Sequence, residues 1–226
     1  MSGAELGILL LSLKVGLVSL VASLPVAIAV AFVLARKDFP GKTLFDALVH
    51  LPLVLPPVVV GFALLVLFGT QGPIGSLLEP LGIVFAFRWT GAALAAAIMG
   101  FPLLVRAVRL SIESVDPRLE LAARTLGASR TRVFFTVTLQ LAASGVATGA
   151  LLAFARALGE FGATITFVSN IPGETRTLPL AIYTATQVPN GDAAALRLSI
   201  ISILVSLGAL ALSEWMVRRH KRGAHA

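Results

Sequence analysis

The sequence lacks cysteine and lacks the motifs of the common self-contained enzymes. With no cysteine among 226 residues, it has no means of forming a disulfide, a thiolate nucleophile or a cysteine-ligated metal site. It contains neither H-E-x-x-H nor G-x-S-x-G, and its three histidines are scattered. Gly41-Lys42-Thr43 resembles the end of a phosphate-binding loop, but the first glycine of that loop would fall at Arg36. We therefore expect no catalytic centre and no ATP site of this type in the chain.

The composition indicates an integral membrane protein. Hydrophobic residues make up 57% of the chain and the mean hydropathy is +0.94, whereas soluble domains are roughly 45–50% apolar. A helix needs about 20 apolar residues to cross about 30 Å of hydrocarbon. Because a strand with open edges would leave backbone polar groups unsatisfied there, we predict an all-α membrane protein.

Five apolar stretches are candidates for membrane spans, and no long polar segment remains for a soluble domain. The fourth span is expected within the window from Val133 to Val168, and a turn-rich, irregular or re-entrant loop is expected at 170–192. The predicted transmembrane domain covers residues 11–214, and residues 215–226 form a basic cytoplasmic tail. The predicted spans lie at about 15–35, 48–68, 89–109, 137–160 and 196–216.

Single residues within or beside these spans carry further expectations. Pro52, Pro56 and Pro57 predict a kink in the second span, which is either a hinge for movement or a fixed bend. We interpret His50 as a capping or packing residue and not as a metal ligand. Lys14 is expected to extend its amine toward the outer membrane surface, the alternative being that it faces the interior of the helix bundle.

Basic residues gather in three places that alternate with less basic loops. They follow the first span, lie between the third and fourth spans, and follow the fifth. Because cytoplasmic loops carry the excess of lysine and arginine, this pattern places the N-terminus outside and the C-terminus in the cytoplasm. The basic tail needs no nucleic-acid partner to explain it. The residues concerned are Arg36, Lys37, Lys42, Arg106, Arg109, Arg118, Arg124, Arg130, Arg132, Arg218, Arg219, Lys221 and Arg222.

The segment from Asp116 to Arg132 is basic, rich in small residues and set between two spans. Asp116 followed by Pro117 predicts a helix start, and Gly127 predicts its end near Leu126. Ser129 is placed to cap a second helix. One face of the first helix is formed by Leu119, Ala122, Ala123 and Leu126, whereas Glu120 and Arg124 lie on another. Such a helix either docks into a groove of a partner protein or lies on lipid headgroups.

This segment resembles a motif of the permease subunits of ATP-binding-cassette importers. Ala122-Ala123-x-x-x-Gly127, followed by Val137 and Leu139, is similar to E-A-A-x-x-x-G-(nine residues)-I-x-L-P. The glutamate of the motif falls at Leu121, with Glu120 one place early, and its proline falls at Gln140. The resemblance implies that this loop couples the chain to a cytoplasmic ATPase subunit. The coupling residues implied are Leu119, Glu120, Ala122, Ala123, Leu126 and Gly127.

The resemblance extends over essentially the whole chain and is most specific for bacterial molybdate permease subunits. The matching stretches are FPGK at 39–42, HLPLVLPPVVVG at 50–61, LEPLGIVFAFRW at 78–89, FARALGEFGATITFVSNIPGETRTLPLAIY at 154–183, and SEW at 213–215. The family implies a type I importer fold and a homodimer in the inner membrane that imports molybdate by alternating access. It implies two partners, an ATPase subunit pair that holds ATP and Mg and a periplasmic binding protein that delivers the oxyanion. No cofactor is expected in this chain.

Other functions stay open at this point. The nearest alternative is the same machine carrying sulfate or tungstate, since the binding protein selects the ligand. A secondary transporter or channel would need no ATPase, and the absence of an obvious internal repeat counts against it. A membrane-embedded enzyme would need clustered catalytic side chains, which the sequence does not offer.

Arg156 and Glu160 are ionisable residues inside the predicted fourth span. Four residues apart, they share a helical face. Isolated charges in the membrane would cost several kcal/mol, so the two residues are expected to pair or to face a polar passage. In one interpretation Arg156 of each copy presents a positive site to a divalent oxyanion and Glu160 orients it. In the other, the two residues form a structural ion pair that neutralises itself.

Overall fold

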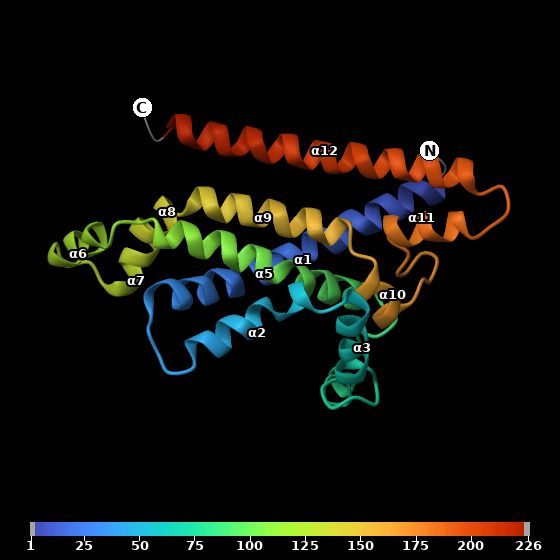
Figure 1. Ribbon diagram of the computed structural model, residues 1–226, viewed down its shortest axis with the longest axis horizontal. Helices are drawn as coiled ribbons and strands as arrows, with labels where there is room; N and C mark the ends of the chain where they lie inside the picture. Colours follow the sequence, from blue (N-terminus) through green and yellow to red (C-terminus); the bar gives the residue numbers. More distant parts are fainter. Residues whose placement is uncertain (1–2, 224–226) are drawn as a thin grey trace.

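The chain folds into helices joined by short loops (Figure 1). The computed structural model describes the backbone of residues 3–223 and the side chains of residues 3–209 and 211. The longer helices are α1 (Gly3–Arg36), α2 (Lys42–Val54), α3 (Pro57–Phe68), α5 (Trp89–Glu113), α6 (Pro117–Thr125), α9 (Ala143–Leu158), α10 (Gly162–Val168), α11 (Leu178–Thr186) and α12 (Asp192–Gly223). The shorter ones are α4 (Gly75–Leu78), η1 (Glu79–Leu81), α7 (Arg130–Val133), η2 (Phe134–Thr138) and α8 (Leu139–Leu141).

The described residues contain enough apolar helix for the expected membrane spans. Three helices are long and apolar enough to cross a membrane, namely α1, α5 and α12 over 192–209. Two bent pairs raise this number to as many as five if each pair counts as one span. The prediction of an all-α membrane protein is thus confirmed, whereas the span limits stay predictions. The basic side chains predicted after the fifth span lie outside the described residues.

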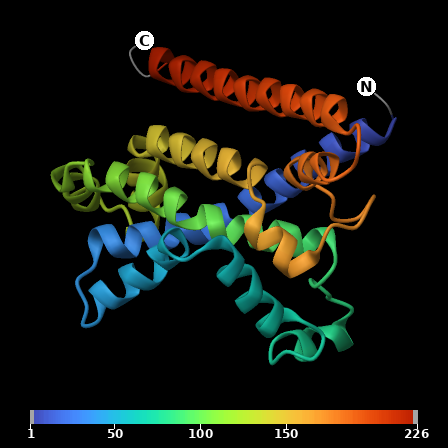
Figure 2. The same cartoon turned by 45° about the vertical axis from the view of Figure 1, so that its right-hand side comes forward.

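The centre of the molecule is formed by α1, α5 and α9, which lie along one another (Figures 1 and 2). Small residues permit their close approach. Ala27 and Ala31 of α1 are fully buried in the same apolar cluster as Val105 and Val108 of α5. A Cβ atom added at Gly149 of α9 would lie 3.1 Å from the Leu104 side chain of α5. This packed centre gives the surrounding elements a rigid support.

The predicted kink in the second span is a complete break between α2 and α3. The two helices meet at 112°. Leu55 and Pro56 between them have extended backbones, with ψ of 142° and 132°, because a residue that precedes proline is driven out of the helical region. Instead of continuing along α2, helix α3 turns aside and packs on α10 (Figure 2). Gly61 makes this contact so close that an added Cβ would lie 2.5 Å from the Ala163 carbonyl oxygen.

The predicted fourth span is also interrupted. The helical stretch 130–141 meets α9 at 70°, with the bend at Ala142. Helix α9 then ends at Leu158, and α10 begins at Gly162. The window 137–160 is therefore not one straight helix, and Glu160 lies in a break instead of inside a span.

Different helices lie at the two ends of the molecule. Helices α6 and α7 project at one end, beside the C-terminal end of α1 (Figure 1). At the other end the start of α1 lies beside the start of α12, where Arg197 Nε donates to Glu5 Oε1 over 3.2 Å. The loop expected to be irregular at 170–192 contains α11, which is tied to α1 by the hydrogen bond from the Leu178 N–H to Ser12 Oγ. Lys14 lies over the Trp89 ring, 3.5 Å from its centroid, a favourable cation–π geometry.

Candidate functional site: the α6 segment and its ionic supports

Helix α6 has the capping structure that its sequence predicts. Asp116 Oδ1 accepts a hydrogen bond from the Arg118 N–H over 2.9 Å, and Pro117 occupies the first turn. The helix ends at Thr125, one residue before the predicted end, and Gly127 has the expected left-handed backbone with φ of 87°. Since only glycine adopts that conformation without strain, these residues fix a short helix with a sharp exit.

The second predicted cap is also present. Ser129 Oγ accepts from the Arg132 N–H over 3.3 Å and starts α7. The chain therefore turns within three residues after α6, and α6 and α7 form a projection at the end of the molecule (Figure 1). A rigid projection of this size is suited to contact with another protein.

One face of α6 is available to a partner. Leu119 is 49% exposed and Leu126 is 88% exposed. Ala122 is also exposed and Ala123 is half-buried. At 100° per residue these four positions share one side of the helix. An exposed apolar side flanked by alanines permits a close approach of another surface.

Glu120 does not belong to that face. Its Oε1 accepts from Arg36 Nη2 and from Thr138 Oγ1, each over 2.9 Å. The same Arg36 nitrogen donates to the carbonyl oxygen of Val115 over 2.9 Å. This cluster of Arg36, Glu120 and Thr138, here called the Glu120 brace, ties α6 to the ends of α1, α5 and η2. The sequence gives no local signal for it, because Arg36 lies 84 residues away along the chain.

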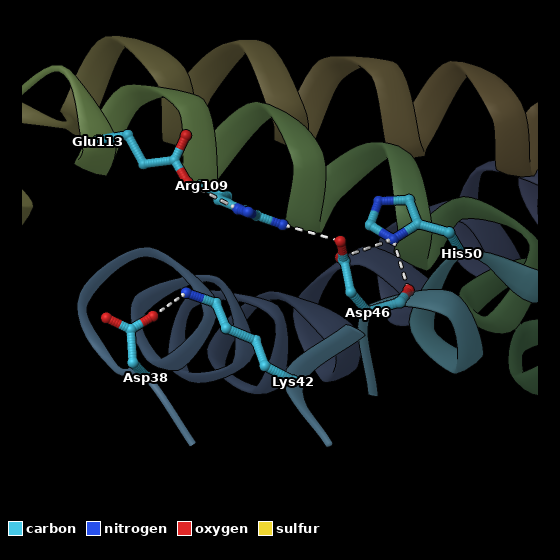
Figure 3. Close-up of polar contacts among 6 residues, drawn as sticks. All are labelled: Asp38, Lys42, Asp46, His50, Arg109 and Glu113. Atoms are coloured by element: carbon cyan, nitrogen blue, oxygen red, sulfur yellow. Dashed lines mark hydrogen bonds and ion pairs between the residues drawn. The ribbon is translucent and has the colours of Figure 1, made fainter. Parts of the chain in front are cut away.

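A second ionic network holds α2 against α5 (Figure 3). Arg109 donates to Glu113 over 2.7 Å along α5 and to Asp46 of α2 over 3.1 Å. His50 Nδ1 lies 2.9 Å from the carbonyl oxygen of Asp46 and 3.2 Å from its carboxylate. Because a carbonyl oxygen only accepts, Nδ1 carries the proton, which agrees with the packing interpretation of His50.

Lys42 and Asp38 form a neighbouring ion pair, with Nζ 2.9 Å from Oδ1 (Figure 3). The Asp38 side chain is 99% exposed. Exposed pairs of this kind contribute about 0–1 kcal/mol. The Arg109 network is the one that links two helices, because Arg109 contacts Glu113 on α5 and Asp46 on α2, whereas Lys42 and Asp38 lie only four residues apart in the chain.

Arg156 and Glu160 form the ion pair that their spacing predicts, although not on one helix. Arg156 Nη1 lies 2.5 Å from Glu160 Oε2. Glu160 is nearly inaccessible, with a side chain 1% exposed, and its other oxygen accepts from the Ala163 N–H over 2.8 Å at the start of α10. The Arg156 side chain is 27% exposed. Glu160 is therefore a capping and pairing residue, and Arg156 is the member of the pair that solvent or a ligand reaches.

The sequence matches a family of transport proteins and is similar to permease proteins of other organisms. Residues 23–222 match the family described as binding-protein-dependent transport system inner membrane component. The chain is 60% identical over 210 residues, 92% of each chain, to the molybdenum transport system permease protein ModB of Escherichia coli (strain K12). It is 39% identical to the sulfate transport system permease protein CysW of Synechococcus elongatus, over 94% of this chain and 75% of that one.

Solved structures share the fold. A bacterial ABC transporter involved in the import of alginate matches with a TM-score of 0.77 and 18% identity, over 97% of this chain and 80% of that one. At that identity the likeness concerns the arrangement of helices alone.

Proposed function

Because this chain belongs to the family of binding-protein-dependent transport system inner membrane components, we propose that it is the permease subunit of an ATP-driven importer of molybdate. The 60% identity to the E. coli molybdenum permease supports molybdate as the substrate. The chain works by alternating access in the cytoplasmic membrane of a bacterium. It has no phosphate-binding loop of its own, so ATP and Mg are held by a separate ATPase subunit.

The observation that carries this proposal is the doubly capped projection of α6 and α7. Its exposed side of Leu119, Ala122, Ala123 and Leu126 docks into the ATPase subunit, and Gly127 fixes the exit of the chain. Glu120 acts from behind that side as a positioning residue, through the brace to Arg36. A movement of the ATPase is thereby passed to the ends of α1 and α5.

The assembly we propose contains two copies of this chain in the membrane, two ATPase subunits and a binding protein outside. The N-terminus lies outside and the C-terminus in the cytoplasm. The position of α6 supports this orientation. It projects at the end of the molecule where α1 ends (Figure 1), next to Arg36 and Lys37, and cytoplasmic surfaces carry the excess of positive charge.

Arg156 is the candidate contact for the oxyanion on its path. Its side chain keeps 27% of its surface exposed while Glu160 neutralises and orients it. A divalent anion at this point would meet the guanidinium of Arg156. Glu160 holds that group in place and is itself held by the Ala163 N–H of α10. The alternative, a purely structural ion pair, is supported by the burial of Glu160, and the two differ in what happens to transport when Arg156 loses its charge.

Sulfate is the second candidate substrate, since the chain is also 39% identical to a sulfate permease. A transporter or channel without an ATPase has no comparable support. The test is uptake of labelled molybdate into proteoliposomes that contain this chain, its ATPase and the binding protein, with sulfate and tungstate as competitors. ATP-dependent uptake that resists sulfate is expected. Uptake abolished by sulfate would transfer the assignment to sulfate, and uptake that needs no ATPase would overturn the importer.

A further inference from the structure

A cavity of about 730 Å³ lies behind α6, on the side away from the proposed ATPase contact. Its walls come from the last two turns of α1 and the following Lys37, from α6, and from α7 and η2. A cavity of this size is in the range that holds a small ligand or the head of a larger one.

The cavity is apolar on one part of its wall and basic on another. Ala29, Phe32 and Val33 of α1 and Phe134 of η2 form apolar lining. The basic lining residues are Arg36, Lys37, Arg124 and Arg130. From Ala29 to Arg36 the α1 helix advances about 10 Å. The lining thus changes from apolar to cationic over the depth at which a phospholipid changes from acyl chain to headgroup.

The cationic part of the wall is not neutralised by the protein. Glu120 lines the cavity but already forms an ion pair with Arg36, with Oε1 2.9 Å from Nη2. Lys37, Arg124 and Arg130 are exposed, and among the described residues none of these three takes part in an ion pair. Three like charges around one cavity repel one another, and an anion placed among them removes that repulsion.

The cavity uses a different side of α6 from the docking side. Pro117, Glu120, Leu121 and Arg124 face it. At 100° per residue these positions lie nearly opposite the side formed by Ala122, Ala123 and Leu126. A ligand in the cavity and a partner on the docking side can therefore be bound at the same time.

We propose that this cavity binds an anionic phospholipid of the cytoplasmic leaflet. The headgroup phosphate lies among Lys37, Arg124 and Arg130, and the first part of the acyl chains lies against Phe32 and Val33. The apolar wall favours a lipid over a free inorganic anion, which would gain nothing from it. Bound lipid then supports α6 from behind while the ATPase contacts it from the front. The inference rests on the proposed orientation, in which this end of α1 is cytoplasmic.

The test is native mass spectrometry of the purified full-length chain in detergent, titrated with phosphatidylglycerol and with phosphatidylcholine. Wild-type protein is expected to retain phosphatidylglycerol preferentially. Because a basic side chain near an anionic surface contributes about 1 kcal/mol, each charge removed should weaken that binding about fivefold. The variant Lys37→Gln/Arg130→Gln is compared with Arg118→Gln/Arg132→Gln, which removes the same charge from exposed positions of the same segment that do not line the cavity.

The expected result is loss of the phosphatidylglycerol preference in Lys37→Gln/Arg130→Gln and its retention in the control. Equal loss in both variants, or equal binding of the two lipids by the wild-type chain, would overturn the proposal. Displacement of the lipid by an excess of inorganic phosphate would identify a free-anion site instead. Because the measurement records bound lipid and not uptake, a chain that transports another anion would give the same result.

To locate the bound molecule, a phosphatidylglycerol that carries a photoreactive acyl chain is cross-linked to the wild-type protein. Attachment within residues 29–37 or at Phe134 is expected from the lining. Attachment confined to other helices would contradict the assignment even if the lipid preference were present.

Discussion

Replacing Glu120 by alanine should uncouple α6 from the transmembrane helices. The substitution removes the acceptor shared by Arg36 and Thr138, so a guanidinium remains at a partly buried position without its carboxylate. The exposed docking side of the helix is left unchanged. We therefore expect both the free energy of unfolding and the coupling of ATP hydrolysis to transport to fall.

The size of the stability loss follows from the burial of the pair. Exposed ion pairs contribute about 0–1 kcal/mol, and removal of one partner of a buried pair costs about 3–5 kcal/mol. The Arg36 and Glu120 side chains are 16% and 20% exposed, which places them between these limits, at about 2 kcal/mol. Glu120→Gln keeps an acceptor for Thr138 and should lose about half of that.

The assay is unfolding of the purified chain by a denaturing detergent, with Glu113→Ala as control. Glu113 is 38% exposed, and its partner Arg109 keeps Asp46, so its loss should stay below about 1 kcal/mol. A double-mutant cycle with Arg36→Met isolates the pair from the separate effects of the two side chains. If Glu120→Ala costs no more than Glu113→Ala, or if the cycle gives no coupling energy, the reasoning about the Glu120 brace is refuted.

Three further predictions concern single positions. Gly127→Ala should lower the free energy of unfolding by about 1 kcal/mol through its left-handed backbone alone, and it should also weaken ATPase binding measured by co-purification. Gly7→Ala, where an added Cβ also meets open space, is the control, and equal stability of the two variants would contradict the prediction. Gly61→Ala should cost about 1–3 kcal/mol, because its Cβ would meet the Ala163 carbonyl at 2.5 Å, with the loss read from the same unfolding assay; a cost as small as that of Gly7→Ala would show that α3 and α10 do not pack this closely. Arg156→Gln should assemble normally and reduce ATP-driven uptake at least tenfold if the residue meets the anion, whereas uptake at the wild-type rate would leave only the structural ion pair.

The caps of α6 and α7 were predictable because their signals are local. Asp116, Gly127 and Ser129 act on backbone groups within three residues of themselves, so the sequence around each contains the whole interaction. The all-helical class was predictable for a similar reason, since long apolar runs in a membrane leave helices as the acceptable structure.

Contacts between distant segments were not predictable in the same way. By their spacing Glu120 and Arg124 share a helical face, whereas the structure pairs Glu120 with Arg36, 84 residues away along the chain. The contact of Arg109 with Asp46 also joins separate helices, and neither residue carries a pattern that selects the other. Which cation reaches which acid depends on how α1, α2 and α5 pack.

The breaks in helices were predictable only in part. Prolines 52, 56 and 57 predict a disturbance of the second span, but a missing hydrogen bond does not specify an angle, and the 112° turn arises where α3 packs on α10. The spacing of Arg156 and Glu160 predicts their contact, yet the reason given for it, a shared helical face, is wrong because α9 ends at Leu158. Glu160 is held instead by the start of α10.

The central claim is that the exposed side of α6 docks an ATPase subunit. The most direct measurement is the affinity of the purified ATPase for this chain in detergent, compared between Ala122→Arg on the docking side and Leu121→Arg, an exposed position on the cavity side of the same helix. The account predicts that Ala122→Arg weakens binding at least tenfold and that Leu121→Arg leaves it nearly unchanged. Equal affinities for the two variants, or an unaffected Ala122→Arg, would contradict it.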